Sequence, residues 1–104
     1  MASDVFVVPN WNADLNAIET ITLENDACQA TAASATCLAR AIVPWGTDAI
    51  FNRFQCPVLI AELREVAAKA QDSEIGENLL DVAQFIEDRM TAVESLSYVL
   101  FLAD

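Results

Sequence analysis

Carboxylates are the side chains of this sequence that could do chemistry, because it has 16 acidic residues, 5 basic residues and no histidine. Two paired acids can cleave a glycosidic bond, but such sites occupy a large cleft, and 104 residues leave little room for one. The missing histidine removes Ser-His-Asp and Cys-His nucleophiles, most catalytic zinc sites and the usual switch at physiological pH. We therefore expect a protein that is not an enzyme.

Sequence motifs that would hold a cofactor or a metal are also missing. The 2 glycines can form neither a Gly-x-Gly-x-x-Gly loop nor a P-loop. No Asp-x-Asp-x-Asp-Gly calcium loop occurs, despite the many carboxylates. We expect no cofactor and no metal.

The three cysteines, Cys28, Cys37 and Cys56, show no framework spacing. Cys28 and Cys37 fall on opposite faces of an expected helix, so they can neither form a disulfide nor share a metal ion. We interpret all three as buried, reduced thiols, which are typical of a cytosolic protein. The sequence opens without the basic and apolar regions of a signal peptide, and no apolar run approaches the roughly 20 residues of a membrane span. We therefore expect a cytoplasmic location.

The negative charge, formally -11, is segregated along the chain. Residues 1–39 hold five acids and no cation, residues 40–70 sum to +1, and residues 71–104 hold eight acids against one arginine. Nucleic acids and anionic membranes attract basic patches, so this charge argues against both as partners. A basic protein surface is the complementary partner, and charge that only maintains solubility is the alternative.

The longest expected helix, residues 74–94, separates its charge from its apolar side chains. Its expected core face is made of Ile75, Leu79, Val82, Ile86, Met90 and Val93. The opposite side carries what we call the acidic stripe, made of Glu74, Glu77, Asp81 and Asp88. At 100° per residue these four carboxylates fall within a sector of roughly 60°. We predict that the acidic stripe binds basic groups of a partner, and a solvated face screened by salt is the alternative.

A second candidate surface, the N-terminal acidic patch, consists of Asp14, Glu19 and Glu24. It lies in the cation-free first third of the chain, which shares the negative bias of residues 71–104. Charge asymmetry of this kind points to an interaction surface.

The elements that must position these acids are mostly helices. Helices are expected over residues 27–43, 48–54, 57–70 and 74–94, with Ser73 as the N-cap of the last. Short β-type runs at residues 4–8 and 97–102 predict strands that pair with each other or in an oligomer. Residues 13–23 fit either a helix or a strand. We predict a single domain over residues 1–104 of the α+β class, predominantly helical, with four to five helices and short terminal β-strands.

The chain resembles the small acidic immunity proteins of bacterial toxin–immunity systems, especially those of contact-dependent growth inhibition. The resemblance covers about half of the chain. It lies in the helix opening Cys56-Pro57, the acidic helix 74–94 and the ending from Ser97 to Asp104. These proteins share neither a fold nor a set of functional residues, so no residue role is transferred. The resemblance implies tight binding to a basic toxin domain, often a nuclease, whose active site is masked.

We therefore predict an intracellular acidic protein that neutralises a basic protein partner, as an inhibitor or immunity protein. Electrostatic steering would bring the two together, and steric masking would inhibit the partner. The alternative is a small acidic dimeric chaperone or adaptor for an exported protein, whose dimer would form through Tyr98–Leu102. Whether the chain is a monomer or a dimer stays open at this point.

Overall fold

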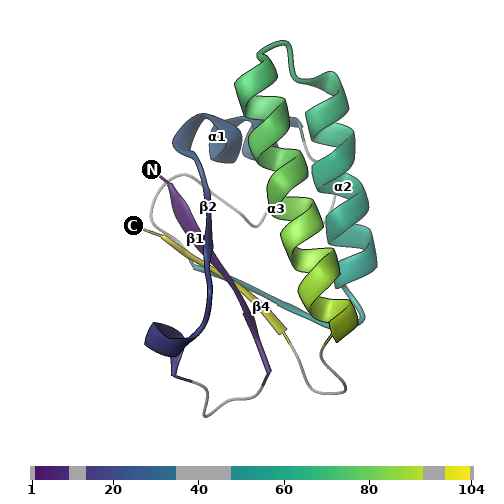
Figure 1. Cartoon of the computed structure of the whole chain (residues 1–104). Coiled ribbons are helices and arrows are strands. Elements are labelled where there is room, and N and C mark those ends of the chain that lie inside the picture. Colours follow the sequence, from purple (N-terminus) through teal and green to yellow (C-terminus); the bar gives the residue numbers. More distant parts are fainter. Residues whose placement is uncertain (1, 10–13, 35–47, 93–97, 104) are drawn as a thin grey trace.

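The computed structural model describes residues 2–9, 14–34, 48–92 and 98–103. Within these ranges, three α-helices accompany a four-stranded antiparallel sheet, and 58% of the residues are helical and 23% are in strands (Figure 1). The elements in chain order are β1 (Ser3–Val8), the 3-10 helix η1 (Leu15–Ala17), β2 (Ile21–Leu23), α1 (Asn25–Ser34), β3 (Ala49–Asn52), α2 (Cys56–Lys69), α3 (Ser73–Ala92) and β4 (Tyr98–Ala103). The α+β class agrees with the sequence prediction, but the expected four to five helices are wrong.

The sheet joins the first and last elements of the described chain. Its strand order is β2-β1-β4-β3, and β1 pairs with β4 from Ser3↔Ala103 to Val8↔Tyr98. The predicted pairing of the terminal β-type runs therefore forms within one chain. From Tyr98 to Phe101, β4 is paired on its other edge with β3. This stretch has no open edge, so a dimer cannot form by adding a strand along it.

The extra strand β3 replaces the short helix expected over residues 48–54. Burial alternates along Ala49–Asn52, with Ala49 and Phe51 buried and Ile50 and Asn52 exposed, which is the two-residue period of a strand. The Phe51 ring meets the Phe101 ring of β4 edge to face, with 5.7 Å between centroids. This packing and the ladder with β4 favour the strand, because they satisfy backbone groups and bury an aromatic ring.

The ambiguous segment 13–23 divides into two elements. Leu15–Ala17 forms η1, and the β-branched end of the segment, Ile21–Leu23, pairs with β1 as β2. The helix expected over residues 27–43 begins at Asn25 and is helical to Ser34. Its remainder lies outside the described residues, as does Cys37.

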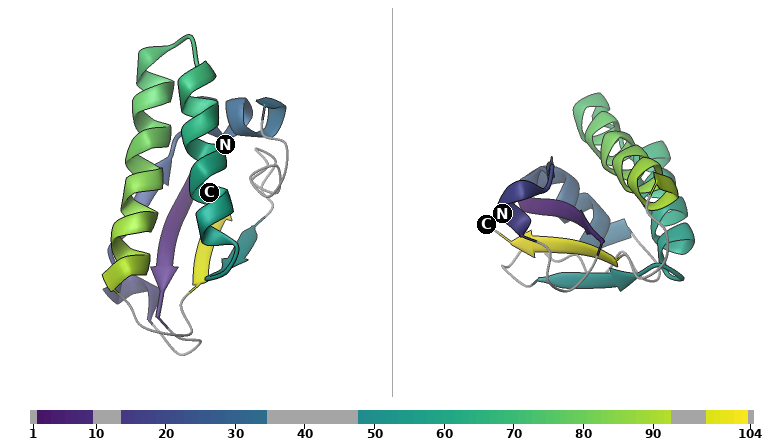
Figure 2. Two further views of the ribbon diagram at one scale, coloured as in Figure 1. Left: turned by 90° about the vertical axis from the view of Figure 1, so that its right-hand side faces the viewer. Right: turned by 60° about the horizontal axis from the view of Figure 1, so that its bottom comes forward.

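Helices α2 and α3 lie side by side against one face of the sheet (Figure 2). The predicted core face of α3 is confirmed, because Leu79, Val82 and Ile86 are fully buried and Met90 is nearly so. Ile75 is half-buried at the edge of the core, and Val93 lies outside the described residues. These side chains pack with apolar residues of α2 and of the sheet in one cluster. The core therefore fixes which face of α3 meets solvent.

The first turn of α3 is capped by Asp72, not by Ser73 as predicted. The Asp72 Oδ1 atom accepts hydrogen bonds from the backbone N–H groups of Glu74 at 2.8 Å and of Ile75 at 3.4 Å. Ser73 is the first residue of the helix itself. A carboxylate in this position satisfies unpaired N–H groups and interacts favourably with the helix dipole.

Candidate functional site

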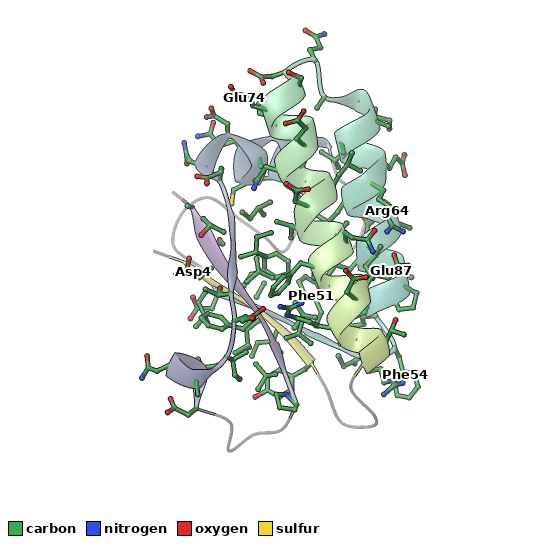
Figure 3. The ribbon with its side chains drawn as sticks, in the orientation of Figure 1. Asp4, Phe51, Phe54, Arg64, Glu74 and Glu87 are labelled. Atoms are coloured by element: carbon green, nitrogen blue, oxygen red, sulfur yellow. The ribbon has the colours of Figure 1, made fainter. Side chains whose placement is uncertain are left out.

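The acidic stripe lies on the solvent face of α3. Glu74, Glu77, Asp81 and Asp88 are all exposed, on the side opposite the buried core face of the helix. Figure 3 shows Glu74 near the beginning of α3, with its side chain pointing outward. The predicted placement of these four carboxylates in solvent is therefore observed, whereas their binding role stays a prediction.

Glu77 and Asp81 of the stripe lie next to each other on α3 and have no compensating group among the described residues. Among the residues that the structure describes, neither Glu77 nor Asp81 has an ion-pair or hydrogen-bond partner for its carboxylate. They are four positions apart, where like charges on a helix repel. Asp88 differs, because its Oδ1 atom accepts a 2.7 Å hydrogen bond from the Gln84 amide.

A cation borders the stripe on the side of α2. Arg64 pairs with Glu87 and also donates to the Gln84 Oε1 atom at 3.3 Å (Figure 3). Gln84 thus connects Arg64 with Asp88. This polar chain lies toward the C-terminal end of α3 and leaves Glu77 and Asp81 outside it.

Arg89 borders the opposite side of the stripe. Its guanidinium lies 4.0 Å from the centroid of the Phe85 ring and pairs with Glu19. Glu19 was expected to contact a partner as part of the N-terminal acidic patch. In the structure it pairs with a cation of the same chain, and its partner-binding role stays a prediction.

Helices α1 and α3 begin beside each other, and their first turns line a small acidic depression of about 100 Å³. Its carboxylates are Glu24, Asp26, Asp72 and Glu74. The structure thereby places Glu24 of the N-terminal acidic patch close to Glu74 of the stripe. Sequence reasoning missed Asp26 and Asp72 as members of this site. Their position at helix starts was the available signal, since acids collect there.

Asn78 holds the two sides of the acidic depression together. Its Oδ1 atom accepts from the backbone N–H of Glu24, and its Nδ2 atom donates to the Thr22 carbonyl, both at 2.9 Å. This side-chain amide of α3 thus fastens the chain at the end of β2, directly before α1. No local pattern in the sequence predicts such a contact, because it joins residues more than 50 positions apart.

Three of the four acids that line the depression also stabilise the starts of helices. Asp72 caps α3, and Asp26 and Glu74 lie in the first turns of α1 and α3, where the helix dipoles favour negative charge. Their types are therefore explained without a partner. Glu77 and Asp81 lie beyond the first turn and have no such explanation.

Asp14 does not belong to the same surface. Its Oδ1 atom accepts from the Asn16 N–H at 3.0 Å and caps η1. Figure 1 shows η1 near the opposite end of the sheet from α1. The N-terminal acidic patch is thus three separate positions, of which only Glu24 joins the stripe.

The two described cysteines are buried, as predicted. Cys56 is 2% exposed, and its Sγ atom lies 3.2 Å from the Asn52 carbonyl oxygen. Burial raises the pKa of Cys56 to about 11 and raises the pKa of Cys28 above the ordinary thiol value. Raised thiol pKa values disfavour the nucleophilic thiolate.

The described ranges contain no group of three or more histidine, cysteine, aspartate or glutamate side chains arranged to hold a metal ion. None of the helices in those ranges is long and apolar enough to cross a membrane. No protein-family model, curated protein or solved structure matches this chain.

Proposed function

We propose that this chain is an acidic binding protein that neutralises a basic protein partner, as an inhibitor or immunity protein for a toxin domain. The observation that carries the proposal is the pair Glu77 and Asp81 on the exposed face of α3, for which the described part of the chain provides no cation. Such a pair costs the isolated helix about 0.2–0.5 kcal/mol. A cation supplied by a partner removes that cost and adds attraction.

The distribution of the cations supports the same proposal. Arg64, Lys69 and Arg89 each pair with an acid of this chain, namely Glu87, Glu65 and Glu19. These pairs lie beside the stripe or on α2, so they leave its central part negative. Among the described residues, these ion pairs leave Glu77 and Asp81 of the stripe without a cation.

The proposed binding surface consists of the acidic stripe and the acidic depression at the N-terminal end of α3. The stripe steers a basic surface toward the protein, since complementary potentials raise association rates. The depression of about 100 Å³ has room for the charged end of one lysine or arginine side chain. Once docked, the bulk of α3 covers the partner surface and blocks access to it.

The test uses the protein encoded by the gene adjacent to this one, purified and immobilised. Its association with the wild-type chain is compared with that of the double variant Glu77→Lys, Asp81→Lys at low and at physiological salt. We expect the on-rate to fall at least 10-fold at low salt, and the salt dependence to weaken. The same partner's toxicity to growing cells provides the functional readout, because the wild-type chain should suppress it.

A matched control variant distinguishes the effect of where the charges lie from the effect of the change in net charge. The double variant Asp14→Lys, Glu65→Lys changes the net charge by the same amount on surfaces away from the stripe. It should retain most of the on-rate. Equal losses in the two double variants, or no loss in either, would contradict a binding role for the stripe.

A further inference from the structure

Leu80 is an apolar side chain on the exposed face of α3, beside two acids of the acidic stripe. It is 48% exposed. Glu77 precedes it by three positions and precedes Asp81 by four. Residues three or four positions apart are neighbours on the surface of a helix. Glu77 therefore has Leu80 on one side and Asp81 on the other, and this surface combines two carboxylates with a partly exposed apolar group.

The contacts of Arg89 show how a guanidinium binds beside α3. It lies 4.0 Å from the centroid of the Phe85 ring and also pairs with Glu19. Arg89 thus combines an apolar side chain of the helix with a carboxylate. Leu80 and Glu77 provide the same two kinds of group on another part of α3. Among the described residues, no cation pairs with Glu77.

Arg64, which approaches α3 from α2, also contacts two groups of that helix. It pairs with Glu87 and donates to the Gln84 Oε1 atom at 3.3 Å (Figure 3). Gln84 lies seven positions after Glu77, so the two side chains project from nearly the same face, two turns apart. Among the described residues, Lys69 makes a single such contact, within α2. A planar guanidinium with several donors is suited to bridging two groups, whereas an ammonium is a point charge.

We propose that this part of α3 binds an arginine side chain of the partner in preference to a lysine. The aliphatic stem of the arginine packs on Leu80, and its guanidinium lies between the carboxylates of Glu77 and Asp81. Its N–H donors form a fork that can pair with both carboxylates at once. An ammonium is more strongly hydrated and gains less from such a site. Because the preference concerns the acidic stripe, it rests on the proposed function and specifies the basic group that the partner presents.

The contact with Leu80 adds to the interaction what charge alone does not provide. Exposed charges mainly raise the association rate, whereas packed contacts mainly slow dissociation. An arginine stem can cover apolar surface while its charged end stays at the carboxylates. Leu80→Ala should therefore raise the dissociation rate and leave the association rate nearly unchanged.

The test uses two peptides of equal length and equal charge, in which the basic residues are all arginine or all lysine, with glycine between them. Calorimetry and stopped-flow fluorescence measure their binding to the full chain at about 20 mM and about 150 mM salt. We expect the arginine peptide to bind about 10-fold more tightly. Leu80→Ala should raise its dissociation rate about 5-fold. The double variant Glu77→Gln, Asp81→Asn should abolish the preference, because the two carboxylates that the guanidinium bridges are gone.

Two control variants match these changes elsewhere on the molecule. Val58→Ala removes a 47% exposed apolar side chain from α2 and should leave both dissociation rates unchanged. The double variant Asp14→Asn, Glu65→Gln removes the same amount of charge as the variant of the stripe. It should weaken both peptides slightly and to the same extent, so that the preference for arginine is retained.

Equal affinities for the two peptides, both reduced by Glu77→Gln, Asp81→Asn, would overturn the preference for arginine and leave the proposed acidic surface intact. Affinities that this double variant does not change would contradict both proposals. A dissociation rate that Leu80→Ala leaves unchanged would overturn the contact with the arginine stem. A preference that is equally lost in Asp14→Asn, Glu65→Gln would overturn its assignment to α3.

Discussion

Arg89 in α3 pairs with Glu19, a residue 70 positions earlier in the chain, and lies over the ring of Phe85. The contact ties the segment before β2 to the exposed flank of α3. It also divides the acidic residues into two groups. Glu19 is matched within the fold, whereas Glu77 and Asp81 present their charge to solvent.

The first prediction is that Arg89 contributes more than Glu19 to the free energy of unfolding. Glu19→Gln should cost less than about 1 kcal/mol of unfolding free energy, because Glu19 is largely exposed and surface pairs contribute little. Arg89→Ala should cost more, since it also removes the stacking on Phe85. Urea unfolding of both variants measures the difference. Equal losses would show that the Phe85 contact adds nothing.

The second prediction identifies the cap of α3. Asp72→Ala should lower the unfolding free energy by about 1 kcal/mol, because two backbone N–H groups lose their acceptor. Ser73→Ala should have little effect, since Ser73 is inside the helix. Asp72→Asn is the matched control, which retains an accepting oxygen and removes the charge. A larger loss for Ser73→Ala than for Asp72→Ala in thermal unfolding would restore Ser73 as the cap.

The parts of the fold that could be predicted depend on patterns within one element. The core face of α3 follows from apolar residues spaced at three and four positions, and its exposed acids follow from the same helical geometry. The two terminal strands were recognised because their apolar β-type runs are short and could only be satisfied by pairing. Strand β3 was missed because Ala49–Asn52 is too short for its alternation to outweigh the helix signals beside it.

The candidate site, like the fold, could be predicted only where it depends on a single element. The stripe lies on one helix, so its exposure could be read from the sequence. The proximity of Glu24 to Glu74 depends on Asn78 fastening the end of β2 to α3, a contact between distant residues. The pairing of Glu19 with Arg89 likewise depends on how η1 and β2 divide residues 13–23. No pattern within a single element predicts either contact.

The third prediction concerns pH. Burial raises the pKa of Cys56 to about 11 from the ordinary value of 9.0, so the folded protein favours the neutral thiol. Its contribution to stability is complete below pH 9 and is lost as the pH rises toward 11, by roughly 2 kcal/mol. Unfolding free energies at intervals across this range measure the loss, and Cys56→Ala is the control without the titrating group. A slope shared by both proteins would place its origin in other groups.

The fourth prediction tests whether the acidic stripe costs the fold stability. In the double variant Glu77→Gln, Asp81→Asn the like-charge repulsion is removed, while the side-chain sizes are nearly unchanged. We expect the unfolding free energy to rise by about 0.2–0.5 kcal/mol at low salt. The gain should shrink at high salt, where the repulsion is already screened.

The matched control for this variant is Glu87→Gln, which removes an acid of the same helix that is paired with Arg64. It should leave the unfolding free energy unchanged or lower it. If neutralising Glu77 and Asp81 also lowers stability, the two carboxylates are compensated within the fold. The reason to assign them to a partner would then disappear, because the proposal depends on charge that no described residue of the chain matches. If stability rises as expected, folding does not require these two charges, which is the outcome that the proposed binding role predicts.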